Sequence, residues 1–147
     1  MKFTTTFLLV VGIISSAVNA NIALTSPYTS ITWQANKKYV VTWEDNGQEP
    51  LLKKLGTVNV DLVTGSDGNY ILVKNIANVK ATQKKTPSWE VPKELGPPGA
   101  YYFIRTTSGD NLSFSGKFDI QGITGTIPGF TPTDTTNSFV SIALQYL

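Results

Sequence analysis

Short runs in which apolar and polar residues alternate recur along the chain, and they restrict its fold more than any other feature. In one of these runs Tyr39, Val41 and Trp43 occupy every second position. Side chains two positions apart lie on the same face of a β-strand, so each run predicts a strand with one buried face. Turn-forming segments such as Gly65-Ser66-Asp67-Gly68 separate the runs. No segment combines a helical period with capping residues, so the pattern indicates an all-β protein.

About seven such strands are predicted, at the spacing of an antiparallel β-sandwich. We therefore expect a single sandwich of immunoglobulin or fibronectin III type, whose last strand runs from Phe114 to Ile120. The chain has no cysteine, so the core must be built from apolar side chains without the disulfide of antibody domains. We expect this core to rest on Trp43, Trp89 and Tyr102, with both tryptophans buried between the sheets.

Residues 1–20 have the features of a secretory signal peptide. Lys2 supplies a positive charge, Phe7–Ile14 is a short apolar segment, and Val18-Asn19-Ala20 places compact residues at the cleavage site. The apolar segment is shorter than the roughly 20 residues needed to cross a bilayer, so we expect no membrane span. The predicted parts are a signal peptide (1–20), an Ig-like domain (21–121) and a C-terminal region (122–147), and we expect a secreted, extracellular or cell-wall location.

The C-terminal region begins as a linker rich in Gly, Thr and Pro and ends in a short apolar tail. A glycosylphosphatidylinositol signal needs small residues, a polar spacer of about 8–12 residues and an apolar tail of about 10–20. Phe139 directly follows the small pair Asn137-Ser138, and the tail contains Gln145. We therefore expect no such anchor.

The composition argues against several kinds of site. The sequence has neither histidine nor cysteine, which are the usual ligands of zinc, copper and iron–sulfur clusters, so we predict no metal site and no cofactor. Removal of Lys2 with the signal peptide leaves eleven basic and ten acidic side chains. This balance argues against nucleic acid and against an anionic membrane as partners.

Catalysis has little support in the sequence. Glycoside hydrolysis needs two carboxyl groups about 5 to 9.5 Å apart across a cleft. The candidate pairs are Glu44 with Asp45, at a strand end where acidic residues commonly form turns, and Glu90 with Glu94, of which Glu90 should face solvent. We therefore predict that the protein is not an enzyme and has no catalytic residues.

The segment Tyr101–Arg105 is the strongest candidate for a binding site. Alternation predicts that Tyr102 and Ile104 face the core and that Tyr101, Phe103 and Arg105 face outward. Outward aromatic rings offer flat platforms for the C–H faces of sugars, and a guanidinium group can donate hydrogen bonds to hydroxyl groups. We therefore predict that Tyr101, Phe103 and Arg105 contact a ligand. The alternative is that one of the rings packs under a loop or against the C-terminal tail.

Asn111-Leu112-Ser113 is an N-glycosylation sequon, and it lies in a predicted turn. A glycan on Asn111 would keep this turn exposed to solvent, and the motif is compatible with a secreted eukaryotic glycoprotein.

Six motifs occur in the order found in the N-terminal Ig-like domain of the fungal Kre/Knh cell-wall family, which the chain resembles over roughly residues 22–120. They are Thr25-Ser26-Pro27 with Ile31-Thr32-Trp33, Tyr39-Val40-Val41-Thr42-Trp43, Val60-Asp61-Leu62-Val63-Thr64-Gly65, Trp89-Glu90-Val91-Pro92, Gly99–Arg105, and Ser115-Gly116-Lys117-Phe118-Asp119-Ile120. The glycine that the family has in the turn after Thr32-Trp33 falls near Ala35-Asn36, where this chain has no glycine. The long Ser/Thr-rich stalk of anchored members is also missing.

This resemblance implies a secreted, non-catalytic module in fungal cell-wall organisation, acting in β-glucan assembly or binding. It implies no catalytic residues, and its partner would be a cell-wall polysaccharide or a wall-assembly protein. Two alternatives stay open: a secreted interaction protein that binds another protein outside the wall, and, with least support, a carbohydrate-active enzyme.

Overall fold

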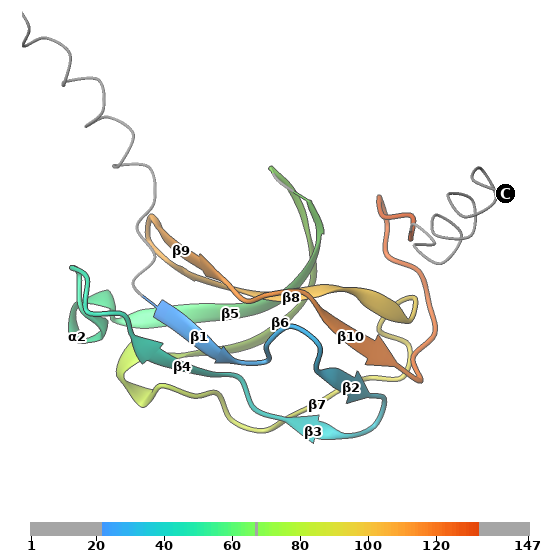
Figure 1. Ribbon diagram of the computed structural model, residues 1–147, viewed down its shortest axis with the longest axis horizontal. Helices are drawn as coiled ribbons and strands as arrows, with labels where there is room; N and C mark the ends of the chain where they lie inside the picture. Colours follow the sequence, from blue (N-terminus) through green and yellow to red (C-terminus); the bar gives the residue numbers. More distant parts are fainter. Residues whose placement is uncertain (1–21, 67, 133–147) are drawn as a thin grey trace, which may run out of the picture.

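The computed structural model describes residues 22–66 and 68–132 and shows a β-sandwich (Figure 1). Its strands are β1 (Ile22–Ser26), β2 (Thr32–Gln34), β3 (Lys38–Tyr39), β4 (Thr42–Asp45), β5 (Thr57–Ser66), β6 (Asn69–Lys80), β7 (Trp89–Glu90), β8 (Gly99–Ser108), β9 (Asn111–Phe114) and β10 (Phe118–Gln121). Two short helical turns, α2 (Leu52–Leu55) and η2 (Ala81–Gln83), join strands. Among the described residues, no helix is long and apolar enough to span a membrane.

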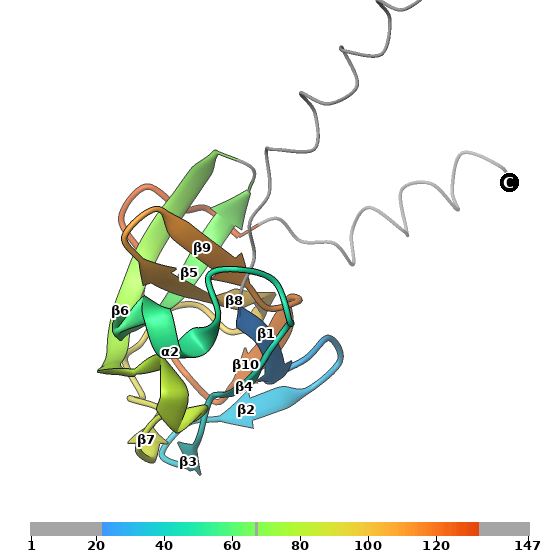
Figure 2. The same ribbon diagram turned by 90° about the vertical axis from the view of Figure 1, so that its left-hand side faces the viewer.

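The larger layer is a six-stranded sheet in the order β2-β10-β8-β5-β6, and β9 also pairs with β8. Strands β5 and β6 form a long antiparallel hairpin in which Gly65 lies opposite Tyr70. Figure 2 shows the tip of this hairpin projecting beyond β8 and β9. The turn predicted from the Gly-Ser-Asp-Gly segment is therefore present, although Asp67 itself lies outside the described residues.

The second layer combines the pairs β1-β4 and β3-β7. Strands β3 and β4 belong to one extended segment, because the amide of Thr86 donates to the carbonyl of Val41 and the amide of Trp43 donates to the carbonyl of Lys84. These two bonds continue the β3-β7 pairing toward β4. Figures 1 and 2 show this layer against one face of the larger sheet.

The chain moves from one layer to the other between its first two strands. β1 pairs antiparallel with β4, whereas β2 pairs parallel with β10 in the larger sheet. The expected β-sandwich is present, but it contains one parallel pair, β2 with β10, beside its antiparallel pairs. The crossover places a strand beside β10 in the same chain direction, which alternation along a single strand cannot indicate.

The largest buried side chains are those of Trp33, Trp43, Tyr102 and Phe118, each at most 1% exposed. The indole N–H of Trp43 donates a 2.9 Å hydrogen bond to the carbonyl oxygen of Ala81, so its polar atom is satisfied inside the core. Trp43 and Tyr102 therefore have the predicted positions.

Trp89 does not have its predicted position, because it is only half-buried. It lies on the two-residue strand β7. The fully buried indole beside it is that of Trp33, which stacks on Tyr39 at 4.7 Å between ring centroids with 4° between the planes. Trp89 packs on the side of this pair, 6.1 Å from Trp33. A two-residue strand at the edge of a layer has too few neighbours to cover an indole.

The expected last strand, Phe114 to Ile120, is two strands. β9 and β10 lie along the same edge of β8, opposite its second and first halves, and residues 115–117 separate them. At this break the hydroxyl of Ser115 accepts from the amide of Ile104, and the amide of Ser115 donates to the carbonyl of Ile104, both at 2.9 Å. The serine side chain thus replaces one bond of the ladder, and residues 115–117 belong to neither strand pairing.

The packed part of the chain continues past Gln121, where the composition suggested a linker. Ile123 and Ile127 are 3% and 5% exposed and belong to the core. The amide of Thr124 donates to the carbonyl of Lys93, and the Thr124 carbonyl accepts from the amide of Gly96. The buried side chains of Ile123 and Ile127 therefore hold this Gly/Pro-rich segment against the domain. The predicted signal peptide and apolar tail lie outside the described residues.

Candidate functional site: an aromatic groove

Strand β8 presents its residues to two environments, as alternation predicts. Tyr102 and Ile104 are fully buried in the core. Tyr101, Phe103 and Arg105 lie on the opposite face of the sheet, where Phe103 is opposite Val63 and Arg105 is opposite Asp61 on β5. Phe103 is nevertheless only 6% exposed, so the expectation that its ring faces solvent is wrong.

Two other aromatic rings cover Phe103. Tyr70, at the start of β6, meets it edge-on at 5.5 Å, and Phe114, at the end of β9, meets it at 6.0 Å between ring centroids. Tyr70 and Phe114 lie 4.7 Å apart. Phe114 is 39% exposed, so this cluster of three rings has a solvent-facing side. The register of three different strands brings the rings together.

Arg105 is held by the sheet and does not extend toward solvent. Its Nη2 lies 3.2 Å from Asp61 Oδ2, and the side chains are 25% and 10% exposed. The side-chain amide of Asn75 donates a 2.7 Å hydrogen bond to the other carboxylate oxygen of Asp61. Because the guanidinium group already has an anionic partner, it is less free to recognise a ligand than the sequence suggested.

Two adjoining hollows lie beside these rings. The first, of about 690 Å³, is bordered by the tip of the β5–β6 hairpin, Tyr101, Lys117 and residues 128–131. The second, of about 320 Å³, lies over Phe103 and Phe114. Gly65, Ser66, Tyr70 and Lys117 line both hollows. We refer to the two hollows together as the aromatic groove.

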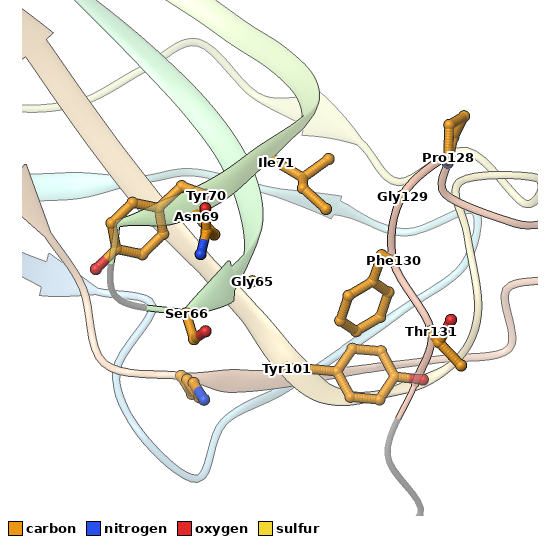
Figure 3. A pocket seen from close by; sticks show the side chains of 11 residues that line it. Gly65, Ser66, Asn69, Tyr70, Ile71, Tyr101, Pro128, Gly129, Phe130 and Thr131 are labelled. Carbon is orange, nitrogen blue, oxygen red and sulfur yellow. The ribbon is translucent and has the colours of Figure 1, made fainter.

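Figure 3 shows the first hollow with Tyr70 on one side and the rings of Tyr101 and Phe130 on the other. These last two rings lie 5.0 Å apart. The hydroxyl of Tyr101 donates a hydrogen bond to the carbonyl oxygen of Pro98, which fixes the direction of its ring. Partial burial raises the pKa of Tyr101, and the nearby carboxylate of Asp119 adds to the rise.

The far wall of the first hollow comes from the segment that composition assigned to a linker. Phe130 is held by a 3.0 Å hydrogen bond from its amide to the carbonyl of Ile127, whose side chain is buried in the core. Sequence reasoning missed Phe130 and Tyr70 as site residues. Phe130 in a stretch of Gly, Thr and Pro was an available signal, whereas the position of Tyr70 depends on how the hairpin folds.

The carboxyl groups considered for catalysis lie elsewhere. Glu44 pairs with Lys84 at 3.2 Å on the surface. Asp45 accepts hydrogen bonds from the backbone amides of Leu52 and Gly47, and these bonds lower its pKa. It therefore forms the turn after β4, as its position predicts. Within the described residues, no three acidic side chains are grouped so that they could hold a metal ion.

The sequon lies where β8 turns into β9. Asn111 is the first residue of β9, and its side-chain Nδ2 donates a 3.1 Å hydrogen bond to the carbonyl oxygen of Ser108. The adjacent Leu112 is 46% exposed, so a turn carrying a glycan here would face solvent. Occupancy of the sequon stays a prediction.

Two packed layers of strands around a tryptophan core, with an aromatic groove on the outer face of the larger sheet, define an immunoglobulin-like β-sandwich module. Residues 26–120 match the family described as the Kre9/KNH-like N-terminal Ig-like domain, and the chain belongs to this family. The chain is also similar to the cell wall synthesis protein KRE9 of Candida albicans, with 27% identity over 150 residues. The similarity covers 89% of this chain and 55% of that protein, so the chain spans about half the length of this curated relative.

Proposed function

We propose that the protein is a secreted, non-catalytic module of fungal cell-wall organisation that binds wall β-glucan through the aromatic groove. The observation that carries the proposal is the groove itself, in which rings from β6, β8, β9 and the 122–130 segment surround two hollows. The family and the relative named for cell wall synthesis support a wall ligand.

The chemistry of the groove suits a neutral sugar chain. A pyranose has apolar C–H faces that pack on aromatic rings, and its hydroxyl groups need hydrogen-bond partners at the rim of the site. Tyr70, Tyr101 and Phe130 supply rings, while Ser66 and Asn69 at the hairpin tip supply polar groups. The hollows measure about 690 and 320 Å³, within the range of small-molecule sites.

The described residues that line the groove do not include the pair of carboxyl groups that glycoside hydrolysis requires. Among the described residues that line the two hollows, Lys117 is the only one with a charged side chain. Asp67 and Asp134 lie outside the described residues. This arrangement supports binding without catalysis.

The three residues predicted from the sequence enter the proposal in different ways. Tyr101 contributes a wall of the first hollow, and Phe103 contributes the floor of the second from beneath Tyr70 and Phe114. Arg105 lies two register pairs along β8 from Phe103, and it would reach a ligand only by loosening its contact with Asp61.

A wall-assembly protein is the second candidate ligand. The outer face of the sheet exposes Leu72 and Leu112 as well as Phe114, at 53%, 46% and 39%. Exposed apolar side chains gathered on one face are typical of protein contact surfaces. The two candidates differ in location, because Leu72 and Leu112 do not line either hollow.

A sedimentation assay on insoluble β-1,3-glucan, β-1,6-glucan and chitin tests the proposal. We expect the mature protein to sediment with a β-glucan and expect Phe130→Ala to weaken this binding. Tyr28→Ala is the matched control, since Tyr28 is 61% exposed and lines neither hollow. Failure to bind all three polysaccharides, with retained capture of a wall protein that Leu72→Ser abolishes, would favour the protein ligand.

A further inference from the structure

Tyr70 occupies a special position, because it borders both hollows of the groove. On one side of it lie Tyr101 and Phe130, which line only the first hollow. On the other side lie Phe103 and Phe114, which line only the second. Each hollow therefore has its own aromatic wall, and the hairpin tip carries the ring between them.

The position of Tyr70 is fixed by packing. Its ring lies 4.7 Å from that of Phe114 at 30°, and it meets Phe103 at 89° and 5.5 Å. Both geometries are favourable for aromatic pairs. The backbone helps as well, since Tyr70 pairs with Gly65 in the hairpin, where the glycine has φ of 108°. A Cβ at position 65 would lie 2.3 Å from the carbonyl oxygen of Asn69, so this approach of the two strands requires glycine.

Both hollows are clefts on the surface, and Ser66 and Lys117 line both of them beside Tyr70. Each hollow alone is large enough for a sugar-sized group, by the usual range of about 300–1,000 Å³ for small-molecule sites. Two adjacent aromatic clefts that share one ring suit a ligand with repeated apolar faces along a chain. A single sugar could occupy only one of the clefts and would leave the other empty.

We propose that the two hollows are two subsites for one glycan chain, which passes over Tyr70 and is held as an internal segment longer than a disaccharide. This inference rests on the proposed function, because it takes the ligand to be a glucan. The hydroxyl of Ser66 and the ammonium of Lys117 lie where the chain crosses from one subsite to the other and can bind its hydroxyl groups there. The affinity must then depend on chain length.

Titration calorimetry with glucose, the disaccharide and longer oligomers of the glucan that the protein sediments with tests this inference. We expect affinity to rise with length beyond the disaccharide and then to level off once both hollows are filled. Phe130→Ala removes a ring of the first hollow only, and Phe114→Ala removes a ring of the second only. Each should lower the affinity for long oligomers about three- to tenfold, as expected for the loss of one aromatic contact, while Tyr28→Ala should change nothing.

Phe114→Leu, which keeps apolar bulk without a ring, replaces Phe114→Ala if the latter variant fails to fold. Equal affinity per molecule for the disaccharide and longer oligomers would overturn the two-subsite inference and leave the proposed glucan binding intact. Length-dependent binding that neither ring substitution weakens would overturn it as well, by placing the chain elsewhere. Absence of binding to any oligomer and to the polysaccharides would overturn both proposals.

Discussion

Arg105 and Asp61 face each other across neighbouring strands on the outer face of the sheet, with Nη2 and Oδ2 3.2 Å apart. The side-chain amide of Asn75 donates a hydrogen bond to the other carboxylate oxygen of Asp61. The aromatic cluster borders the ion pair, because Phe114 is opposite Arg105 in the β8–β9 register. The ion pair therefore forms part of the sheet that supports the second hollow.

We expect Arg105→Ala to lower the free energy of unfolding by about 1–3 kcal/mol, because it leaves a mostly buried carboxylate without its cation. The matched control is Lys84→Ala, which breaks the pair with Glu44 whose side chains are 50% and 60% exposed. Exposed pairs contribute at most about 1 kcal/mol. Urea denaturation measures both, and equal effects of the two substitutions would contradict the buried role of Arg105.

The two tryptophans predicted to form the core should differ in their effect on stability. Trp43→Ala should cost about 3–5 kcal/mol, as for a large buried side chain, and it also removes the donor to Ala81. Trp89→Ala should cost clearly less, because the half-buried indole removes less apolar area from water. Chemical denaturation of the two variants compares them directly, and a Trp89 variant as unstable as the Trp43 variant would refute its position at the edge.

The segment after Gln121 should be needed for full stability. A chain that ends at Gln121 loses the buried side chains of Ile123 and Ile127, each worth about 1.5–3 kcal/mol. A chain that ends at Pro132 keeps both and serves as the control. We expect thermal melting to show a large loss for the shorter chain only. Equal melting temperatures would mean that this segment contributes no stability and would agree with a linker.

Asn111 should carry a glycan when the protein is secreted from a eukaryotic host. The glycosylated amide nitrogen keeps one hydrogen, so its bond to the carbonyl of Ser108 can persist. Treatment with peptide N-glycosidase F should then lower the apparent mass of the wild type and leave Asn111→Gln unchanged. A wild-type mass that equals the bare polypeptide would show that the sequon is not used.

The stability of the domain should fall in alkaline solution because of two tyrosines. Burial raises the pKa of Tyr102, and burial together with Asp119 raises that of Tyr101, from the ordinary value of 10.0. The folded state then holds these protons more tightly than the unfolded state. The associated stability is complete below pH 10.0 and is lost as the pH rises through the raised values. Unfolding measured against pH should show this loss, and Tyr102→Phe should make it smaller.

Local pattern was sufficient for much of the fold. Alternation in Tyr101–Arg105 correctly predicted that Tyr102 and Ile104 face the core, because the two faces of a strand alternate at every residue. The Gly65–Gly68 turn was readable because glycine tolerates backbone angles that other residues avoid. The order of motifs along residues 22–120 also indicated the family to which residues 26–120 belong.

Relationships between distant segments were decided only by the tertiary structure. Alternation placed Phe103 outward, but Tyr70 and Phe114, brought beside it by the pairing of four strands, cover it. The same pairing gave Arg105 its partner Asp61, and docking of Ile127 turned Phe130 into a wall of the groove. The sequence by itself determined which face of each strand is apolar, because that depends on neighbours along the chain. Which surface becomes a site depended on register and on contacts between residues far apart in sequence, and only the folded chain specifies these.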